Sequence, residues 1–117
     1  PCIRIIGDDL DLAGGPVTAL ALIFYELATN AAKYGALTSP SGVVTIEAIA
    51  EDDTISLIWN ERGALLDAEP KKEGFGSQLE RLATVQLGGR IEREWRPDGV
   101  RIVLTMARER LGASKLV

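Results

Sequence analysis

The sequence predicts one α/β domain over residues 1–117: a two-layer sandwich in which helices pack on one face of a mixed, mostly antiparallel sheet. The chain has 117 residues, the length of a single domain of ordinary size, and 46% of them are hydrophobic. Two segments have helical periodicity and five have the composition and alternation of strands, in the order strand, helix, hairpin, loop, helix, hairpin. The alternation predicts one covered and one partly open face of the sheet.

The first helix is expected to begin near Pro16 and to end before Gly35, because proline suits a first helical turn and glycine the position after the last. Its apolar residues fall on one face and are Leu20, Ile23, Phe24, Leu27 and Ala31. The second expected helix is Ser77–Leu87. The expected strands are Ile3–Ile6, Val43–Ala50, Thr54–Glu61, Arg90–Arg96 and Val100–Ala107. Residues 63–74 have no period and are expected to form a loop.

The composition excludes several kinds of site. The chain has no His and a single Cys, so a Ser-His-Asp triad, a His-ligated metal, a Cys-cluster zinc site and an internal disulfide are all excluded. The longest apolar run, Ala19–Tyr25, is too short for a membrane helix, and the acidic N-terminal part is unlike a signal peptide. The chain begins with Pro1 rather than Met, as a piece of a longer protein would.

Charge is distributed unevenly along the chain. Residues 1–60 carry two basic and eight acidic side chains, a balance of −6, and residues 61–117 carry eleven basic and nine acidic ones, a balance of +2, which together give the net charge of −4. An acidic chain with few aromatic residues is not expected to bind nucleic acid. Most of the basic residues are expected to be solvated surface charges, although those of the second half could serve a smaller anion.

A polar stripe on the first helix is the first candidate site. Glu26, Asn30 and Lys33 share one helix face by their spacing of four and three residues. Glutamate can act as a general base, the asparagine carbonyl oxygen is a hard ligand suited to Mg²⁺, and lysine can contact phosphate. The alternative interpretation of the stripe is an amphipathic helix whose polar face meets water.

Two further clusters lie at the end of a strand and at the start of a helix. Trp59 and Glu61 share a strand face, so Glu61 could accept a hydrogen bond from an exocyclic amine such as that of adenine, and Gly63 would let a flat ring approach the backbone. Gly74-Phe75-Gly76-Ser77 precedes the second helix, where free backbone N–H groups attract phosphate, and Lys71 and Lys72 lie in the preceding loop. The alternatives are a strand that ends in a turn, with Trp59 in the core, and a Ser77–Glu80 capping box.

Together these motifs resemble the catalytic ATP-binding domain of the HWE-type sensor histidine kinases. Tyr25–Leu37 resembles the N box of that family, Trp59-Asn60-Glu61 its Trp-x-Glu signature, and Gly74–Ser77 its second glycine box, which Gln86–Gly89 follows as expected. The resemblance covers about residues 10–107. It implies the Bergerat-type ATP-binding fold, which the DNA gyrase B subunit shares.

The resemblance implies a role for each matching residue. Glu26 would be the base that helps to deprotonate the acceptor imidazole, and Asn30 would hold Mg²⁺. Lys33 would contact phosphate, and Tyr34 would line the nucleotide. Glu61 would bind the adenine amine beside Gly63. The residues that would close over the phosphates are Gly74, Phe75, Gly76 and Ser77.

The chain departs from the family at two positions. Tyr25 stands where the family has a His immediately before the N-box Glu, and a tyrosine cannot shuttle protons near pH 7. Gly99-Val100 stands where many members of the superfamily have Gly-Thr.

The resemblance implies γ-phosphoryl transfer from Mg²⁺-ATP to a His, in cis or in trans, on a separate dimerisation domain that this chain lacks. A response-regulator receiver domain would take the phosphate next, and the implied location is cytoplasmic. Two alternatives remain: a Ser kinase or ATPase of the same fold, and a non-catalytic interaction module controlled by nucleotide.

Overall fold

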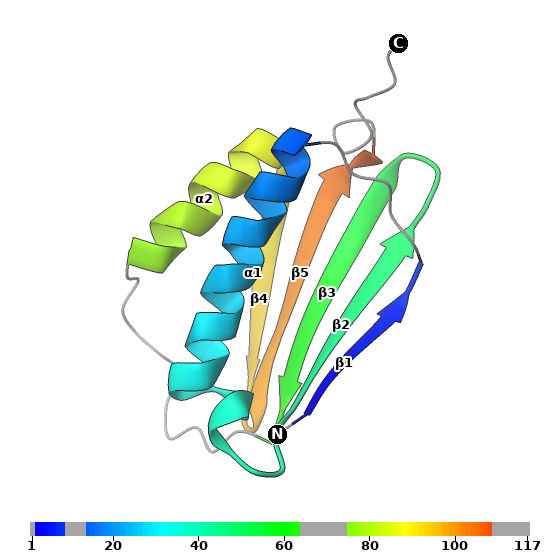
Figure 1. Ribbon diagram of the computed structural model, residues 1–117. Coiled ribbons are helices and arrows are strands. Elements are labelled where there is room, and N and C mark those ends of the chain that lie inside the picture. Colours follow the sequence, from blue (N-terminus) through cyan, green and yellow to red (C-terminus); the bar gives the residue numbers. More distant parts are fainter. Residues whose placement is uncertain (1, 9–13, 64–74, 109–117) are drawn as a thin grey trace.

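The computed structural model describes residues 2–8, 14–63 and 75–108, and the structural statements below concern these residues. Its elements are β1 (Cys2–Gly7), α1 (Gly14–Tyr34), the short 3₁₀ helix η1 (Ala36–Thr38), β2 (Val43–Ala50), β3 (Thr54–Arg62), α2 (Phe75–Leu87), β4 (Gly89–Arg96) and β5 (Gly99–Ala107). Figure 1 shows α1 and α2 side by side on one face of the sheet, which confirms the predicted two-layer α/β sandwich.

The five strands form one mixed sheet in the order β1-β2-β3-β5-β4. β1 pairs in parallel with β2, whereas the other three pairings are antiparallel. The sheet is therefore mixed and mostly antiparallel, as the sequence predicts. Neither helix, as far as the structure describes them, has the length and hydropathy that a membrane crossing requires.

The core lies between the helices and the covered face of the sheet. The buried residues of α1 include Leu20, Ile23 and Leu27, and the alternate residues of β3 and β5 lie opposite them in the same cluster. Phe24 stacks on Trp59 with ring centroids 6.2 Å apart. Because each large apolar side chain that is fully buried stabilises the fold by about 1.5–3 kcal/mol, this cluster fixes α1 across the middle of the sheet.

The start of α2 corrects one interpretation of the sequence. The helix begins at Phe75 rather than Ser77, so Ser77 lies inside the helix and does not precede it. Glu80 makes no capping box, because both of its carboxylate oxygens accept hydrogen bonds from Nη2 of Arg93 at 2.5 Å. Arg93 lies on the covered face of β4, and a charge-assisted bond to a guanidinium is stronger than one to a neutral backbone N–H.

The pKa of Glu80 predicts a pH effect on stability. Burial raises this pKa above its ordinary value, Arg93 opposes the increase, and the charge of Glu26 adds to it. The folded protein therefore holds this proton more tightly than the unfolded chain, and the stability that Glu80 contributes at low pH is lost as the pH rises through its folded pKa. We compare the free energy of unfolding of the wild type with that of Glu80→Gln. The wild-type value minus the variant value is expected to decrease from about pH 4 to about pH 7.

Urea unfolding at a series of pH values measures this difference. Glu94 is exposed and follows Arg93 on β4. The variant Glu94→Gln therefore controls for the loss of one negative charge without changing Glu80. A difference between wild type and Glu80→Gln that grows with pH would contradict the expectation.

Candidate active site

Glu26 and Asn30 form the centre of the candidate site on α1. The side-chain nitrogen Nδ2 of Asn30 donates a hydrogen bond of 2.7 Å to Oε2 of Glu26, and Glu26 is only 9% exposed. An ionised carboxylate only accepts hydrogen bonds, so the amide must turn its NH₂ group to Glu26. The carbonyl oxygen Oδ1 of Asn30 is then directed away from Glu26 and is available to a ligand.

The other residues of the predicted stripe lie at the surface of α1. Lys33 and Tyr34 are both exposed in its last turn. Tyr25, at the position before Glu26, is 69% exposed and does not enter the core. The stripe therefore consists of the nearly buried Glu26, the half-buried Asn30, and an exposed end that a ligand could reach from solvent.

Glu61 joins the end of β3 to the start of η1, just after α1. The residue is 5% exposed. Oε1 accepts a hydrogen bond of 3.0 Å from the backbone N–H of Ala36, and Oε2 accepts one of 2.7 Å from Nε1 of Trp59. A carboxylate has about four acceptor positions, so these two bonds hold the group in place and leave acceptor capacity for a further donor. Trp59 is itself buried, as the alternative interpretation of this strand expected.

Two glycines shape the surroundings of Glu61. A Cβ atom on Gly35 would lie 2.2 Å from Oε1 of Glu61, so only glycine leaves room for the carboxylate there. Gly63 has a φ of +83°, a conformation in which side chains other than glycine are strained, and it lets the chain turn after β3. The sequence predicts Gly35 only as the end of a helix, and its contact with Glu61 arises from the tertiary fold.

Sequence reasoning missed three contributors to this site: Gly35, the N–H group of Ala36 and the indole N–H of Trp59. The hydrogen bond from Trp59 to Glu61 could have been predicted from the sequence, because residues two apart on a strand share a face. No sequence pattern indicates the hydrogen bond from Ala36, since its donor is the backbone of a residue 25 positions away.

The predicted phosphate cradle is described only in part. Gly74, Lys71 and Lys72 lie outside the described residues. Phe75, Gly76 and Ser77 form the first turn of α2, and the structure describes their backbone but not their side chains. The first backbone N–H groups of a helix have no partner within it, and the phosphate site at this helix start stays a prediction from the sequence.

The described residues fit a Mg²⁺ ion that is bound mainly through a nucleotide. Among them, no group of three or more His, Cys, Asp or Glu side chains could hold a metal ion alone. Mg²⁺ commonly takes one or two protein ligands and completes its shell with substrate phosphates and water. A single oriented carbonyl oxygen, Oδ1 of Asn30, is therefore an adequate protein contribution.

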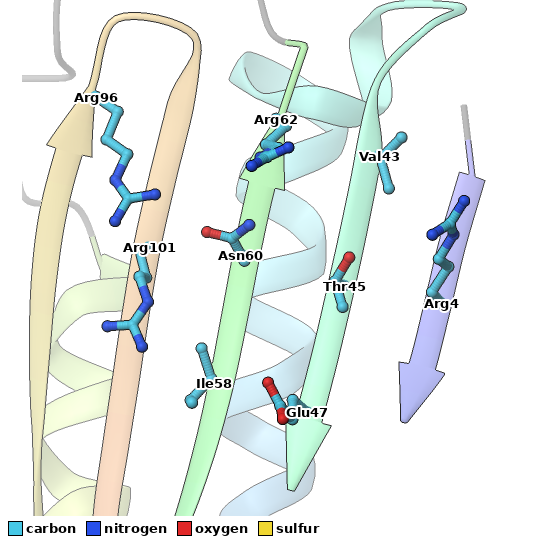
Figure 2. Close-up of a pocket in the computed structure, with 9 residues that line it drawn as sticks. All are labelled: Arg4, Val43, Thr45, Glu47, Ile58, Asn60, Arg62, Arg96 and Arg101. Atoms are coloured by element: carbon cyan, nitrogen blue, oxygen red, sulfur yellow. The ribbon is translucent and has the colours of Figure 1, made fainter. Parts of the chain in front are cut away.

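A cavity of about 490 Å³ is separate from the candidate active site. Its lining residues come from β1 to β5 and stand on the open face of the sheet, opposite the helices (Figure 2). None of the predicted site residues is among them. The cavity and the candidate active site are thus on opposite faces of the sheet.

Sequence comparison finds relatives among light-regulated kinases, although no family profile matches the chain. The chain is 37% identical over 103 residues to blue-light-activated histidine kinase 1 of Erythrobacter litoralis, a match that covers 86% of this chain and 29% of the relative. It is 41% identical over 81 residues to the blue-light-activated histidine kinase of Brucella ovis, covering 66% of this chain and 17% of the relative. The chain thus spans less than a third of either relative.

Solved structures agree on the fold. The histidine kinase domain of an Erythrobacter litoralis blue-light-activated histidine kinase matches 92% of this chain and 51% of its own length, with a TM-score of 0.78 and 17% identity. The catalytic domain of histidine kinase ThkA matches 92% of this chain and 77% of its own length, with a TM-score of 0.66 and 17% identity. The chain is therefore homologous to the blue-light-activated histidine kinases over the segment that it shares with them, and it has the fold of a histidine kinase catalytic domain.

Proposed function

We propose that this chain is the Mg²⁺-ATP-binding catalytic domain of a two-component histidine kinase of the HWE type. The observation that carries the proposal is the hydrogen bond between Asn30 and Glu26. This bond supports the proposal because it would leave the amide oxygen of Asn30 free for a metal ion, with the carboxylate of Glu26 one helical turn away. A base beside a metal-bound phosphate is the arrangement that phosphoryl transfer to a weak nucleophile needs.

The other residues of the site would bind the nucleotide. The remaining acceptor positions of Glu61 would take the exocyclic amine of adenine, with Gly63 giving the ring access to the backbone. Lys33 and Tyr34, exposed in the last turn of α1, would contact phosphate and nucleotide. The loop and helix start at Gly74–Ser77 would enclose the phosphates. When bound, Mg²⁺ would neutralise part of the charge on the phosphate oxygens.

The acceptor histidine must lie outside residues 1–117, because these residues include no His. The relatives are more than three times as long as the matched segment, which leaves room in them for a histidine-bearing domain. We infer that such a domain, in the same or a partner chain, is the phosphoryl acceptor. ThkA has been solved in complex with the response regulator TrrA, which supports a receiver domain as the next acceptor.

Calorimetric titration with Mg²⁺-ADP tests the nucleotide site. We expect the wild-type chain to bind one equivalent, and Glu61→Ala to weaken binding at least about tenfold, since a hydrogen bond to a charged group contributes about 1.5–3 kcal/mol. Trp59→Phe is the matched control: it removes one internal donor to Glu61 and keeps the carboxylate. We expect it to lower stability and to retain most of the binding.

Two outcomes of this titration would contradict the proposal. No binding by the folded wild-type chain would contradict the nucleotide site. Equal losses in Glu61→Ala and Trp59→Phe would show that the loss follows from disturbed packing and not from a missing contact to adenine.

One observation favours a second function, a nucleotide-controlled interaction module without catalysis. Tyr25 is exposed beside Glu26 at the position where HWE-type kinases have a His. A tyrosine stays protonated near pH 7, so this position cannot relay a proton as a histidine would. The module predicts nucleotide binding without phosphoryl transfer, even when a histidine domain is supplied.

A further inference from the structure

The open face of the sheet carries a cavity that the proposed kinase chemistry does not use. Its lining combines basic, polar and apolar side chains from all five strands: Arg4, Val43, Thr45, Glu47, Ile58, Asn60, Arg62, Arg96 and Arg101. Figure 2 shows these side chains standing on the side of the sheet away from the helices. The strand pairings turn one set of alternate residues toward the helices. The same pairings gather the lining residues of the cavity on the opposite, open face of the sheet.

Positive charge in the cavity is only partly compensated. Arg96 donates a hydrogen bond of 3.2 Å to the exposed Glu94. Within the part of the chain that the structure describes, no carboxylate lies within ion-pair distance of Arg4, Arg62 or Arg101. Four arginines outnumber the lining carboxylate of Glu47 and the carboxylate of Glu94, which stands opposite Arg101 on β4, and so leave a positive surface on a chain whose net charge is −4.

A polar row crosses the cavity at right angles to the strands. Arg4 pairs with Thr45, Thr45 with Asn60, and Asn60 with Arg101 on successive neighbouring strands. In the middle of this row, the side-chain oxygen Oδ1 of Asn60 is buried and has no hydrogen-bond partner. An unpaired buried acceptor costs about 1–3 kcal/mol, so a ligand N–H group that reaches Oδ1 after rotation of the Asn60 amide toward the cavity would recover this energy.

The length of the row decides which kind of anion fits. Three strand spacings of about 4.8 Å separate Arg4 from Arg101, or about 14 Å. This is a distance between backbones, so a single phosphate could contact both arginines only if their side chains converged, and Figure 2 shows them over β1 and β5 without converging. Four residues of an extended peptide span about the same distance, and the peptide between them carries N–H donors for Asn60. Nucleic acid could also span the row, but its long polyanionic backbone would be repelled by the acidic remainder of the chain.

We propose that this cavity is a docking site for an acidic polypeptide segment whose carboxylates are about four residues apart. The segment crosses the strands on the open face, with one carboxylate at Arg4, another at Arg101 and Arg62, and a backbone N–H at Asn60. Glu47 lies at one end of the cavity, where its negative charge would repel an acidic residue of the bound segment. This site is independent of the nucleotide site, which lies on the covered face.

Fluorescence anisotropy with a labelled peptide of repeated Glu-Gly-Ser-Gly units tests the proposal on the wild-type chain. The same peptide with Gln for Glu is the control probe. Arg101→Glu removes one end of the row. Arg90→Glu makes the same charge change on the neighbouring strand β4, on the same open face of the sheet but outside the cavity, and is the control variant.

We expect saturable binding of the glutamate peptide, about fivefold weaker binding to Arg101→Glu, unchanged binding to Arg90→Glu, and no competition from Mg²⁺-ADP. Equal weakening by the two variants would overturn the proposal, because it would show general charge attraction. Absence of binding at low salt would also overturn it. Displacement of the peptide by equimolar inorganic phosphate would overturn the proposal and assign the cavity to phosphate. Preferential binding of a single-stranded oligonucleotide or of anionic vesicles would overturn it as well and assign the cavity to that ligand.

Discussion

Replacement of Glu26 by glutamine is expected to reduce phosphoryl transfer to a supplied histidine domain by about a hundredfold or more, without loss of Mg²⁺-ADP binding. General base catalysis commonly contributes 10² to 10⁴ in rate, and glutamine cannot take a proton. The amide oxygen of a glutamine can still accept the bond from Nδ2 of Asn30, so the orientation of Asn30 should persist. Transfer of radiolabelled phosphate from ATP, beside a calorimetric titration, separates the two effects.

Glu47→Gln is the matched control for this experiment. It makes the same chemical change at a carboxylate on the open face of the sheet, and we expect transfer to remain at the wild-type rate. Unchanged transfer in Glu26→Gln would end the proposed base role. Loss of nucleotide binding in Glu26→Gln would instead assign Glu26 to the binding of Mg²⁺-nucleotide.

Substitution of Gly35 by alanine is expected to destabilise the fold by about 3 kcal/mol and to weaken nucleotide binding. The added Cβ would lie 2.2 Å from Oε1 of Glu61 and 3.1 Å from Cα of Ala31. The carboxylate must then move and lose the N–H of Ala36, so an overpacking cost of about 1–3 kcal/mol adds to a lost charged hydrogen bond. Denaturant unfolding measures the first effect and titration with Mg²⁺-ADP the second.

Gly88→Ala provides the control for a glycine substitution without this clash. Gly88 is exposed and has a φ of +67°, so alanine there costs about 1–2 kcal/mol through backbone strain. A cost at Gly35 no greater than that at Gly88, with nucleotide binding intact, would show that Glu61 relaxes freely and that its position is unimportant.

Local patterns were sufficient to predict the two long helices and the five strands of this fold, although not the 3₁₀ helix η1. The apolar spacing from Leu20 to Ala31 predicts the buried face of α1, and period-two spacing predicts the helix-facing residues of β3. The pairing of Glu26 with Asn30 also follows from their separation by one helical turn. In each case the relevant contact is made within one element or follows from its period.

Contacts between distant elements could not be predicted in this way. The Ser77–Glu80 pattern has the form of a capping box, but the fold brings Arg93 of β4 to Glu80, and that partner is invisible in the local sequence. The arginines of the cavity are expected from the sequence to be separate solvated charges. Only the strand order, in which β5 lies between β3 and β4, places Arg4 and Arg101 in one row with Asn60.

The parallel edge of the sheet has a consequence for how the chain folds. β2 and β3 are joined by a tight turn, whereas the paired residues Arg4 and Thr45 are 41 positions apart (45 − 4) with α1 between them. Closing the longer loop costs more chain entropy, and β1 gains little burial in return because all of its residues are exposed. The β2–β3 hairpin can therefore form early from local contacts, whereas β1 adds to the sheet late and is the strand that leaves most readily by local unfolding.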